Sequence, residues 1–125
     1  MTKDAAIQSF FESFDLPAYP ATSVPTSGDG EPVFPYITYT APTDSNMERM
    51  IVNASVWYRS ESLVELNAKV RAISQYVDAG RVIECEDGGI IVRKGSPFAQ
   101  PMGDDADNMI KRKILSFEFL YATVY

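Results

Sequence analysis

The sequence holds few side chains that perform chemistry at neutral pH. It has no histidine, the commonest general base and metal ligand, so histidine-dependent triads and ordinary zinc sites are excluded. Neither a P-loop pattern nor a G-x-G-x-x-G pattern occurs. The one cysteine, Cys85, lies between Glu84 and Glu86, whose negative charges disfavour a thiolate, so we expect a small buried hydrophobe there. This inventory predicts a protein that is not an enzyme and holds no cofactor.

Three groups of carboxylates remain as candidates for chemistry. The runs GDGE (28–31) and DDAD (104–107) could hold a hard cation such as calcium, but neither has the spacing of an EF-hand loop. Solvated loop carboxylates are the favoured interpretation, and a cation site is the alternative. Glu84 and Glu86 could form a catalytic pair on one strand face. At a hairpin tip, however, a charged edge that resists stray strand pairing is favoured. No metal site is therefore predicted.

The basic residues do not favour nucleic-acid binding. The chain has 11 Lys and Arg against 17 Asp and Glu, a net charge of −6, whereas nucleic-acid binding needs a basic surface. The run Lys111, Arg112 and Lys113 could contact phosphates. A solvated strand or a salt bridge between subunits is the favoured interpretation of that run.

Length and composition predict a single domain over residues 1–125. A chain of 125 residues can bury a core of its own, and one cysteine excludes an internal disulfide, so a reducing compartment is the default. No apolar stretch approaches the ~18 residues of a membrane span, so no membrane partner is expected. The domain divides into a short N-terminal helix (about 3–14), a Pro-rich loop (about 15–33) and an α+β core (about 34–125).

Hydrophobic periodicity predicts an α+β fold: a mostly antiparallel sheet with one main helix packed on one face and a short N-terminal helix. The expected elements are a helix at 3–14, strands at 34–40 and 49–59, a helix within 60–81, a hairpin at 81–95, a loop at 96–108 and a strand at 109–125. The last strand changes phase, because Lys111 and Lys113 share a face that becomes strongly apolar from Leu115 onward. A bulge or bend near Ile114 and Leu115 is therefore expected.

Both predicted helices carry an apolar stripe. In the first, Ile7, Phe10, Phe11 and Phe14 recur at helical spacing, and Thr2 can cap the helix. The stripe must be buried against this subunit's sheet or against a neighbouring subunit.

The main helix has two start signals and one stop signal. Ser62 and Glu65 have capping-box spacing, Ser60 is a competing cap, and Gly80 is a fitting end. Its stripe steps by three and four residues through Leu63, Leu66, Val70, Ile73 and Val77.

The strand at 49–59 fixes the direction of the only tryptophan. Its even-numbered residues, from Met50 to Tyr58, are all apolar and form the core face, so Trp57 projects from the more polar side. Packing of Trp57 against the first helix or the Pro-rich loop is the favoured interpretation. A contact with another subunit is the alternative, because tryptophan is enriched among interface anchors.

The order of these stretches resembles the tail terminator proteins of long-tailed bacteriophages. FPYITYT is similar to the family's first strand, IVNASVWYRSES to its second strand, and LVELNAKVRAISQYV to its helix. NMIKRKILSFEFLYATVY is similar to the closing strand, so the resemblance covers about residues 34–125, and the N-terminal helix also fits. None of these stretches is a strict motif.

The resemblance implies a structural virion protein, assembled in the cytoplasm of the host bacterium and located at the junction of head and tail. It would form a homo-oligomeric ring, a hexamer in the virion. That ring would cap the tail-tube protein, stop its growth and offer a surface to the head connector, with DNA only passing through the lumen. A phage head-completion or neck protein is the near alternative, and a small cytosolic metal- or ligand-binding domain is the alternative of a different class. Candidate interface residues are Phe10, Phe11, Trp57, Phe98, Met102, Lys111 and Lys113.

We predict that Trp57→Ala weakens assembly more than it destabilises the monomer. The reason is that an outward tryptophan contributes more to a contact between chains than to the core beneath it. Sizing and thermal melting of the variant measure the two effects, and equal loss in both would contradict the prediction.

Overall fold

The computed structural model describes residues 1–25, 33–42, 49–86, 88–103 and 107–123. The run 28–31 and most of the run 104–107 lie outside these ranges. The structure therefore does not test whether those carboxylates are solvated or hold a cation. Along the chain the elements are α1 (Lys3–Glu12), β1 (Ala18–Pro20), the 3-10 turn η1 (Ala21–Ser23), β2 (Tyr36–Thr40), β3 (Arg49–Arg59), α2 (Val64–Val77), β4 (Arg81–Cys85), β5 (Gly88–Met102) and β6 (Ile110–Thr123).

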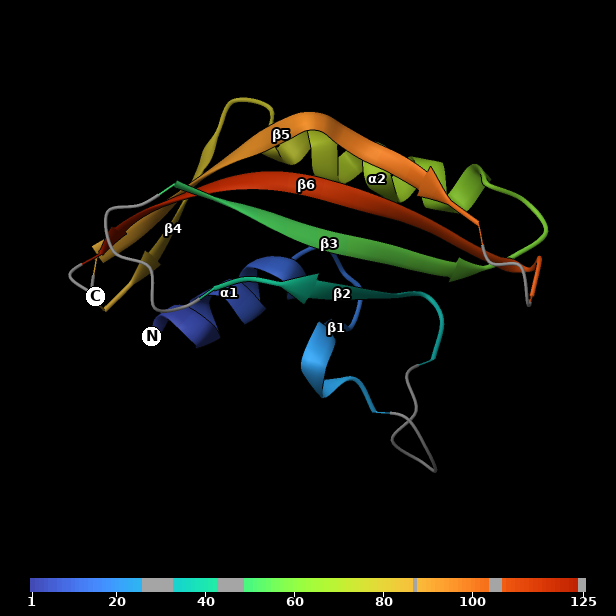
Figure 1. The fold of residues 1–125 in the computed structure, drawn as a ribbon, viewed down its shortest axis with the longest axis horizontal. Coiled ribbons are helices and arrows are strands. Elements are labelled where there is room, and N and C mark those ends of the chain that lie inside the picture. Colours follow the sequence, from blue (N-terminus) through green and yellow to red (C-terminus); the bar gives the residue numbers. More distant parts are fainter. Residues whose placement is uncertain (26–32, 43–48, 87, 104–106, 124–125) are drawn as a thin grey trace.

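The strands form one mixed sheet of six strands in the order β1-β2-β3-β6-β5-β4. Only β1 and β2 run parallel, and the other neighbours are antiparallel. The long strands β3, β6 and β5 lie side by side as curved ribbons along the length of the molecule (Figure 1). The predicted α+β class is confirmed, with two helices and a mostly antiparallel sheet.

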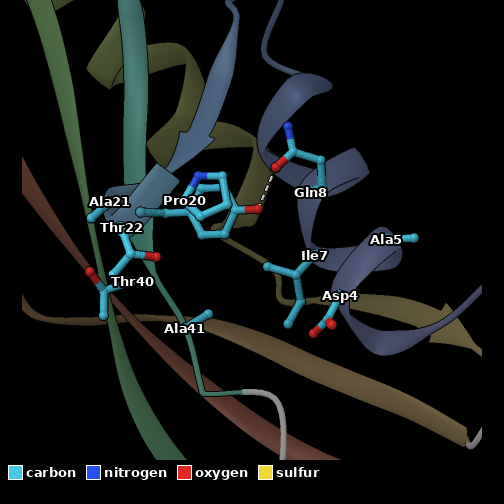
Figure 2. A pocket seen from close by; sticks show the side chains of 10 residues that line it. Asp4, Ala5, Ile7, Gln8, Pro20, Ala21, Thr22, Thr40 and Ala41 are labelled. Carbon is cyan, nitrogen blue, oxygen red and sulfur yellow. Dashed lines mark hydrogen bonds between the residues drawn. The ribbon is translucent and has the colours of Figure 1, made fainter. Parts of the chain in front are cut away.

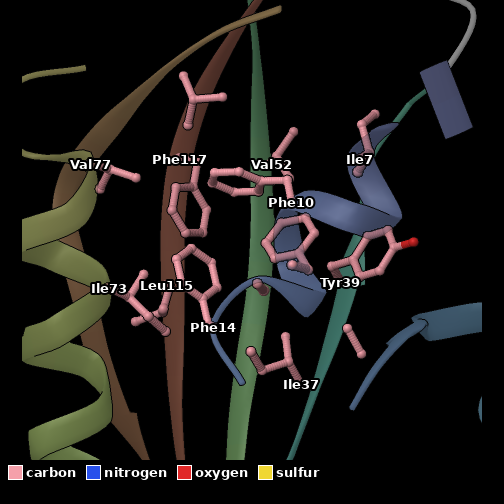
Figure 3. Close-up of a cluster of buried hydrophobic side chains, with 14 of the residues drawn as sticks. Ile7, Phe10, Phe14, Ile37, Tyr39, Val52, Ile73, Val77, Leu115 and Phe117 are labelled. Atoms are coloured by element: carbon pink, nitrogen blue, oxygen red, sulfur yellow. The ribbon is translucent and has the colours of Figure 1, made fainter. Parts of the chain in front are cut away.

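Both helices bury their apolar stripes on one face of the sheet, called here the helix-bearing face. Phe10 and Phe11 of α1 are 7% and 1% exposed, and the Phe10 ring meets that of Phe117 edge-on at 6.1 Å. Leu66 and Ile73 of α2 are buried in the same cluster. Figure 3 shows Phe10, Ile73 and Phe117 among the side chains that meet between the helices and strands. The stripe of α1 is therefore buried by this chain's own sheet.

The alternation predicted for β3 is confirmed. Val52, Ala54 and Val56 are at most 2% exposed on the helix-bearing face, whereas Ile51, directly before Val52 in sequence, is 68% exposed on the other. Burial of large side chains on one face and their exposure on the other follows from the two-residue period of a strand.

The prediction of a bulge in the last strand is wrong. β6 pairs with β3 in one continuous register from Ile110 to Leu120. The irregularity lies in its other neighbour, β5, between Lys94 and Ala99. Lys111 and Lys113 consequently belong to the helix-bearing face, in line with the buried Leu115.

The prediction of a loop at 96–108 is also wrong over its first half, because β5 continues through Met102. Pro97 and Pro101 favoured a loop, since proline cannot donate to a strand ladder. In the structure, β4 pairs with β5 only from Gly88 to Val92, so β5 has no strand neighbour on that edge at either proline. Pro97 also lies within the irregularity between Lys94 and Ala99, and edges and irregularities are where strands tolerate proline.

The Pro-rich loop expected at 15–33 contains two short elements. β1 adds to the sheet edge in parallel with β2, and the Ile37 amide donates to the Pro17 carbonyl at 2.8 Å. Three residues are too few to show a strand period, so the sequence pattern gave no sign of β1.

The ends of the helices are partly as expected. Thr2 caps α1 by accepting from the Ala5 amide at 3.2 Å, and Gly80, with φ of +84°, follows α2. The prediction of a capping box at α2 is wrong. The Ser62 hydroxyl accepts from the Val64 amide at 3.1 Å, one residue earlier than the box requires.

We predict that truncating equal side chains on the two faces has unequal effects. Ile90 is 0% exposed on the helix-bearing face, so Ile90→Ala should lower the free energy of unfolding by about 2–5 kcal/mol. Ile51→Ala should lower it by less than about 1 kcal/mol, because that side chain is already in water. Urea unfolding measures both, and similar losses would contradict the assignment of the faces.

We also predict a loss of stability at alkaline pH that depends on Tyr121. Burial raises the pKa of Tyr121 to about 12, and its hydroxyl donates to the Pro42 carbonyl at 2.5 Å. In the unfolded chain a tyrosine ionises near pH 10, so the stabilisation is complete below about pH 10 and is lost as the pH rises towards 12. The free energy of unfolding should therefore fall more steeply between about pH 9.5 and 11.5 in the native chain than in Tyr121→Phe. Equal slopes would contradict this prediction.

Candidate functional site: the helix-free face

The face of the sheet opposite the helices is the largest candidate surface, and we call it the helix-free face. In the described chain its central members are Tyr36 and Thr38 of β2, Arg49, Ile51, Asn53, Ser55 and Trp57 of β3, Arg112, Ile114, Ser116, Glu118 and Leu120 of β6, Ile91 and Arg93 of β5, and Val82 of β4. The strand registers divide it into an aromatic end, a polar middle and an apolar end.

The aromatic end is built around Trp57. Tyr36, Trp57 and Arg112 are paired across three adjacent strands. The Tyr36 and Trp57 rings are stacked with centroids 5.9 Å apart, and the Arg112 guanidinium lies 4.4 Å from the Trp57 ring centroid. The Trp57 indole nitrogen donates to the Thr38 hydroxyl at 3.0 Å. These contacts fix a flat aromatic and cationic surface on the sheet.

Electrostatics at this end agree with the geometry. Burial raises the pKa of the Tyr36 hydroxyl, while the positive charge of Arg112 opposes that rise. Tyr36 therefore stays neutral at physiological pH and acts as a hydrogen-bond donor and an apolar ring.

The apolar end holds exposed aliphatic side chains. Ile51 is 68% exposed and Val82 65% exposed, and Ile91 and Leu120 lie beside Val82 in one cross-strand row. The one charged pair nearby, Arg49 with Glu118 at 3.4 Å, is mostly exposed and adds little stability of its own. Exposed aliphatic residues bordered by charges are typical of protein-interaction surfaces.

The structure places the predicted interface residues on different surfaces. Trp57 projects from the helix-free face as expected, so α1, on the other face, does not cover it, and Tyr36 and Arg112 lie against it. Residues 26–32 of the Pro-rich loop lie outside the described ranges, so packing of that loop on Trp57 stays an expectation. Phe10 and Phe11 are in the core, which corrects their assignment to a partner contact. Met102, 43% exposed, is paired with Arg112 at the aromatic end.

The remaining three predicted residues lie elsewhere. Phe98 is partly buried, with its ring 5.4 Å from that of Phe117, so it contacts the core. The Lys111 ammonium donates to the Asn108 carbonyl at 2.6 Å, and Lys113 is paired with Val56 on the helix-bearing face. Sequence reasoning missed Tyr36, Arg112 and Val82 as members of the surface, because cross-strand register cannot be obtained from one strand's pattern.

A second concavity lies between α1 and the sheet edge. Figure 2 shows its lining, and its volume is about 510 Å³. The Tyr39 hydroxyl donates to the Gln8 side-chain oxygen there, and burial, with the negative charges of Asp4 and Glu12, raises the pKa of Tyr39. Gln8 in turn donates to the Ala18 carbonyl at 2.7 Å, so its polar atoms already serve to hold β1 against α1.

Cys85 is the cysteine that was considered for chemistry. Cys85 is half-buried and its thiol lies 3.6 Å from the Gly88 carbonyl. Among the residues the structure describes, no three His, Cys, Asp or Glu side chains are grouped so that they could hold a metal ion. No helix in those ranges is long and apolar enough to span a membrane.

Comparison with family models, curated proteins and solved structures finds no match for this chain. The functional argument therefore depends on the geometry of the helix-free face and on the resemblance of the sequence pattern.

Proposed function

We propose that this chain is a structural assembly protein of the tail terminator kind. Its helix-free face is the surface that contacts other protein subunits. In a virion it forms a ring, a hexamer, that caps the tail tube, stops its growth and presents a surface to the head connector. Assembly takes place in the host bacterial cytoplasm, and DNA only passes through the lumen.

The observation that carries the proposal is the exposure of aliphatic side chains at the apolar end. A domain that buries five of its seven phenylalanines nevertheless leaves Ile51 and Val82 in water on one face of its sheet. A neighbouring subunit that covers this face removes that apolar area from water. The aromatic end adds a tryptophan and an arginine, the residue types enriched among interface anchors.

The arrangement also fits a ring. Ring closure needs a head-to-tail contact in which one surface meets a different surface of the next copy. The helix-free face would then meet a different surface of the next copy, away from the exposed side of α2 (Val64–Val77). A net charge of −6 suits a lumen through which DNA slides without sticking.

Two alternatives are separated from this proposal by simple observations. A neck or head-completion protein uses the same kind of surface, and gene order distinguishes it. A terminator's coding region lies just before that of the major tail-tube protein. A small cytosolic ligand-binding domain is favoured by the concavity between α1 and β2. A strict monomer stabilised by calcium or magnesium would support that alternative.

We predict that a charge placed at the apolar end weakens assembly. Val82→Glu should weaken association by tenfold or more, about 1.4 kcal/mol, because the contact would bury an unpaired carboxylate. The matched control is Val64→Glu on the helix side, where the native valine is 72% exposed against 65% for Val82. Sedimentation velocity over a range of concentrations measures both variants.

The control variant should associate as the native chain does. An equal effect of the two substitutions, or a native chain that stays monomeric even with tail-tube ends present, would contradict the proposal.

A further inference from the structure

A hollow of about 260 Å³ lies in the polar middle of the helix-free face. Its lining includes Thr38 and Thr40 of β2, Asn53 and Ser55 of β3, and Arg112 and Ile114 of β6. The strand registers place it between the aromatic and apolar ends, so a partner that covers the face also covers the hollow.

Two hydroxyls in the hollow each already accept one hydrogen bond. The Thr38 oxygen accepts from the Trp57 indole at 3.0 Å, and the Ser55 oxygen accepts from Arg112 Nε at 3.1 Å. Within the described ranges neither hydroxyl donates a hydrogen bond, so each retains its proton for a ligand. Ser55 is 6% exposed and lines the hollow.

Arg112 supplies the positive charge. Stacking on Trp57 and the bond to Ser55 hold the guanidinium in one orientation and use only its Nε. The salt bridges among the described residues engage Arg49, Arg59 and Lys94, and none engages Arg112. Its terminal amino groups therefore remain as a paired donor of the shape that a carboxylate matches.

We propose that the hollow binds a carboxylate, the side chain of an aspartate or glutamate of a protein partner. The donors are one guanidinium and two hydroxyls, which suit a planar anion with two oxygens. Trp57 and Ile114 on its borders suit the apolar part of a polypeptide. A nucleic-acid backbone would need several cations along its length, and the net charge of −6 opposes it. This inference rests on the proposed function, because it names the chemistry of the partner at the same face.

The test is an NMR titration of the isolated chain with a blocked glutamate, N-acetyl-L-glutamic acid N-methylamide. The corresponding blocked glutamine and inorganic phosphate are the comparison probes. Trp57 is the only tryptophan, so its indole N–H gives a single signal next to the hollow. We expect saturable shifts of that signal and of the Thr38 and Ser55 amides with the glutamate probe, and none with the glutamine probe.

Variants test whether Arg112 and Thr38 bind the glutamate probe. Arg112→Gln should raise the dissociation constant of the glutamate probe about tenfold or more, and Thr38→Val should raise it by a smaller factor. Arg49→Gln removes an equal charge from the other end of the same face and should change it less than about twofold. Unchanged signals of the core residues would show that each variant is folded.

Three results would overturn the proposal: no saturable shift with the glutamate probe, equal weakening by Arg112→Gln and Arg49→Gln, or tighter binding of phosphate than of the glutamate probe. The titration does not require assembly. Failure here with normal association would therefore reject the carboxylate site alone, and binding without association would reject the assembly role alone.

Discussion

The antiparallel pairing of β3 with β6 is the constraint on which the rest of the structure depends. The two strands run in one register from Arg49 paired with Leu120 to Arg59 paired with Ile110. Because side chains alternate along a strand, this one register assigns every residue of both strands to a face. A shift by one residue would turn Trp57 towards the helices and Val56 into water. Both the core and the helix-free face would then lose the side chains that form them.

The two faces of the sheet differ in what covers them. The helix-bearing face is closed by α1 and α2, whose phenylalanines and aliphatic residues pack on Phe117, Phe119 and Tyr121. The helix-free face receives no helix in the described chain and carries side chains suited to contact. Its aromatic end, donor-lined hollow and exposed aliphatic end follow one another along the strands. One partner surface can therefore meet apolar, polar and charged groups together, which gives specificity as well as affinity.

Sequence reasoning anticipated what depends on periodicity within one element. The burial stripe of α1, the stripe of α2 from Leu66 to Val77 and the outward direction of Trp57 follow from spacing alone. Leu63 was predicted to belong to the α2 stripe, which is wrong, because it precedes the helix and is 47% exposed. Sequence reasoning also showed that Phe10 and Phe11 must be buried, but spacing cannot say whether this chain or another buries them. Their assignment to an interface was wrong for that reason.

What depends on pairing between elements could not be anticipated. β5 continues past Pro97, where it pairs with β6 as far as Met102 and has no strand neighbour on its other edge. One strand's sequence does not show which of its edges is free. The phase change in β6 suggested a bulge in the wrong strand, since lysines on the helix-bearing face look like a shift when the neighbouring strand is unknown. The cluster of Tyr36, Trp57 and Arg112 joins three strands far apart in sequence, so only the assembled sheet brings it together.

The claim that the helix-free face is a protein contact is tested most directly by hydroxyl-radical footprinting of the free chain and of its assembled form. Met102 on the helix-free face and Tyr76 on α2 are matched reporters, because they are 43% and 41% exposed in the free chain and both side chains oxidise readily. Assembly should protect Met102 and Trp57 while Tyr76 remains reactive. Protection of Tyr76 with Met102 and Trp57 still reactive would contradict the account.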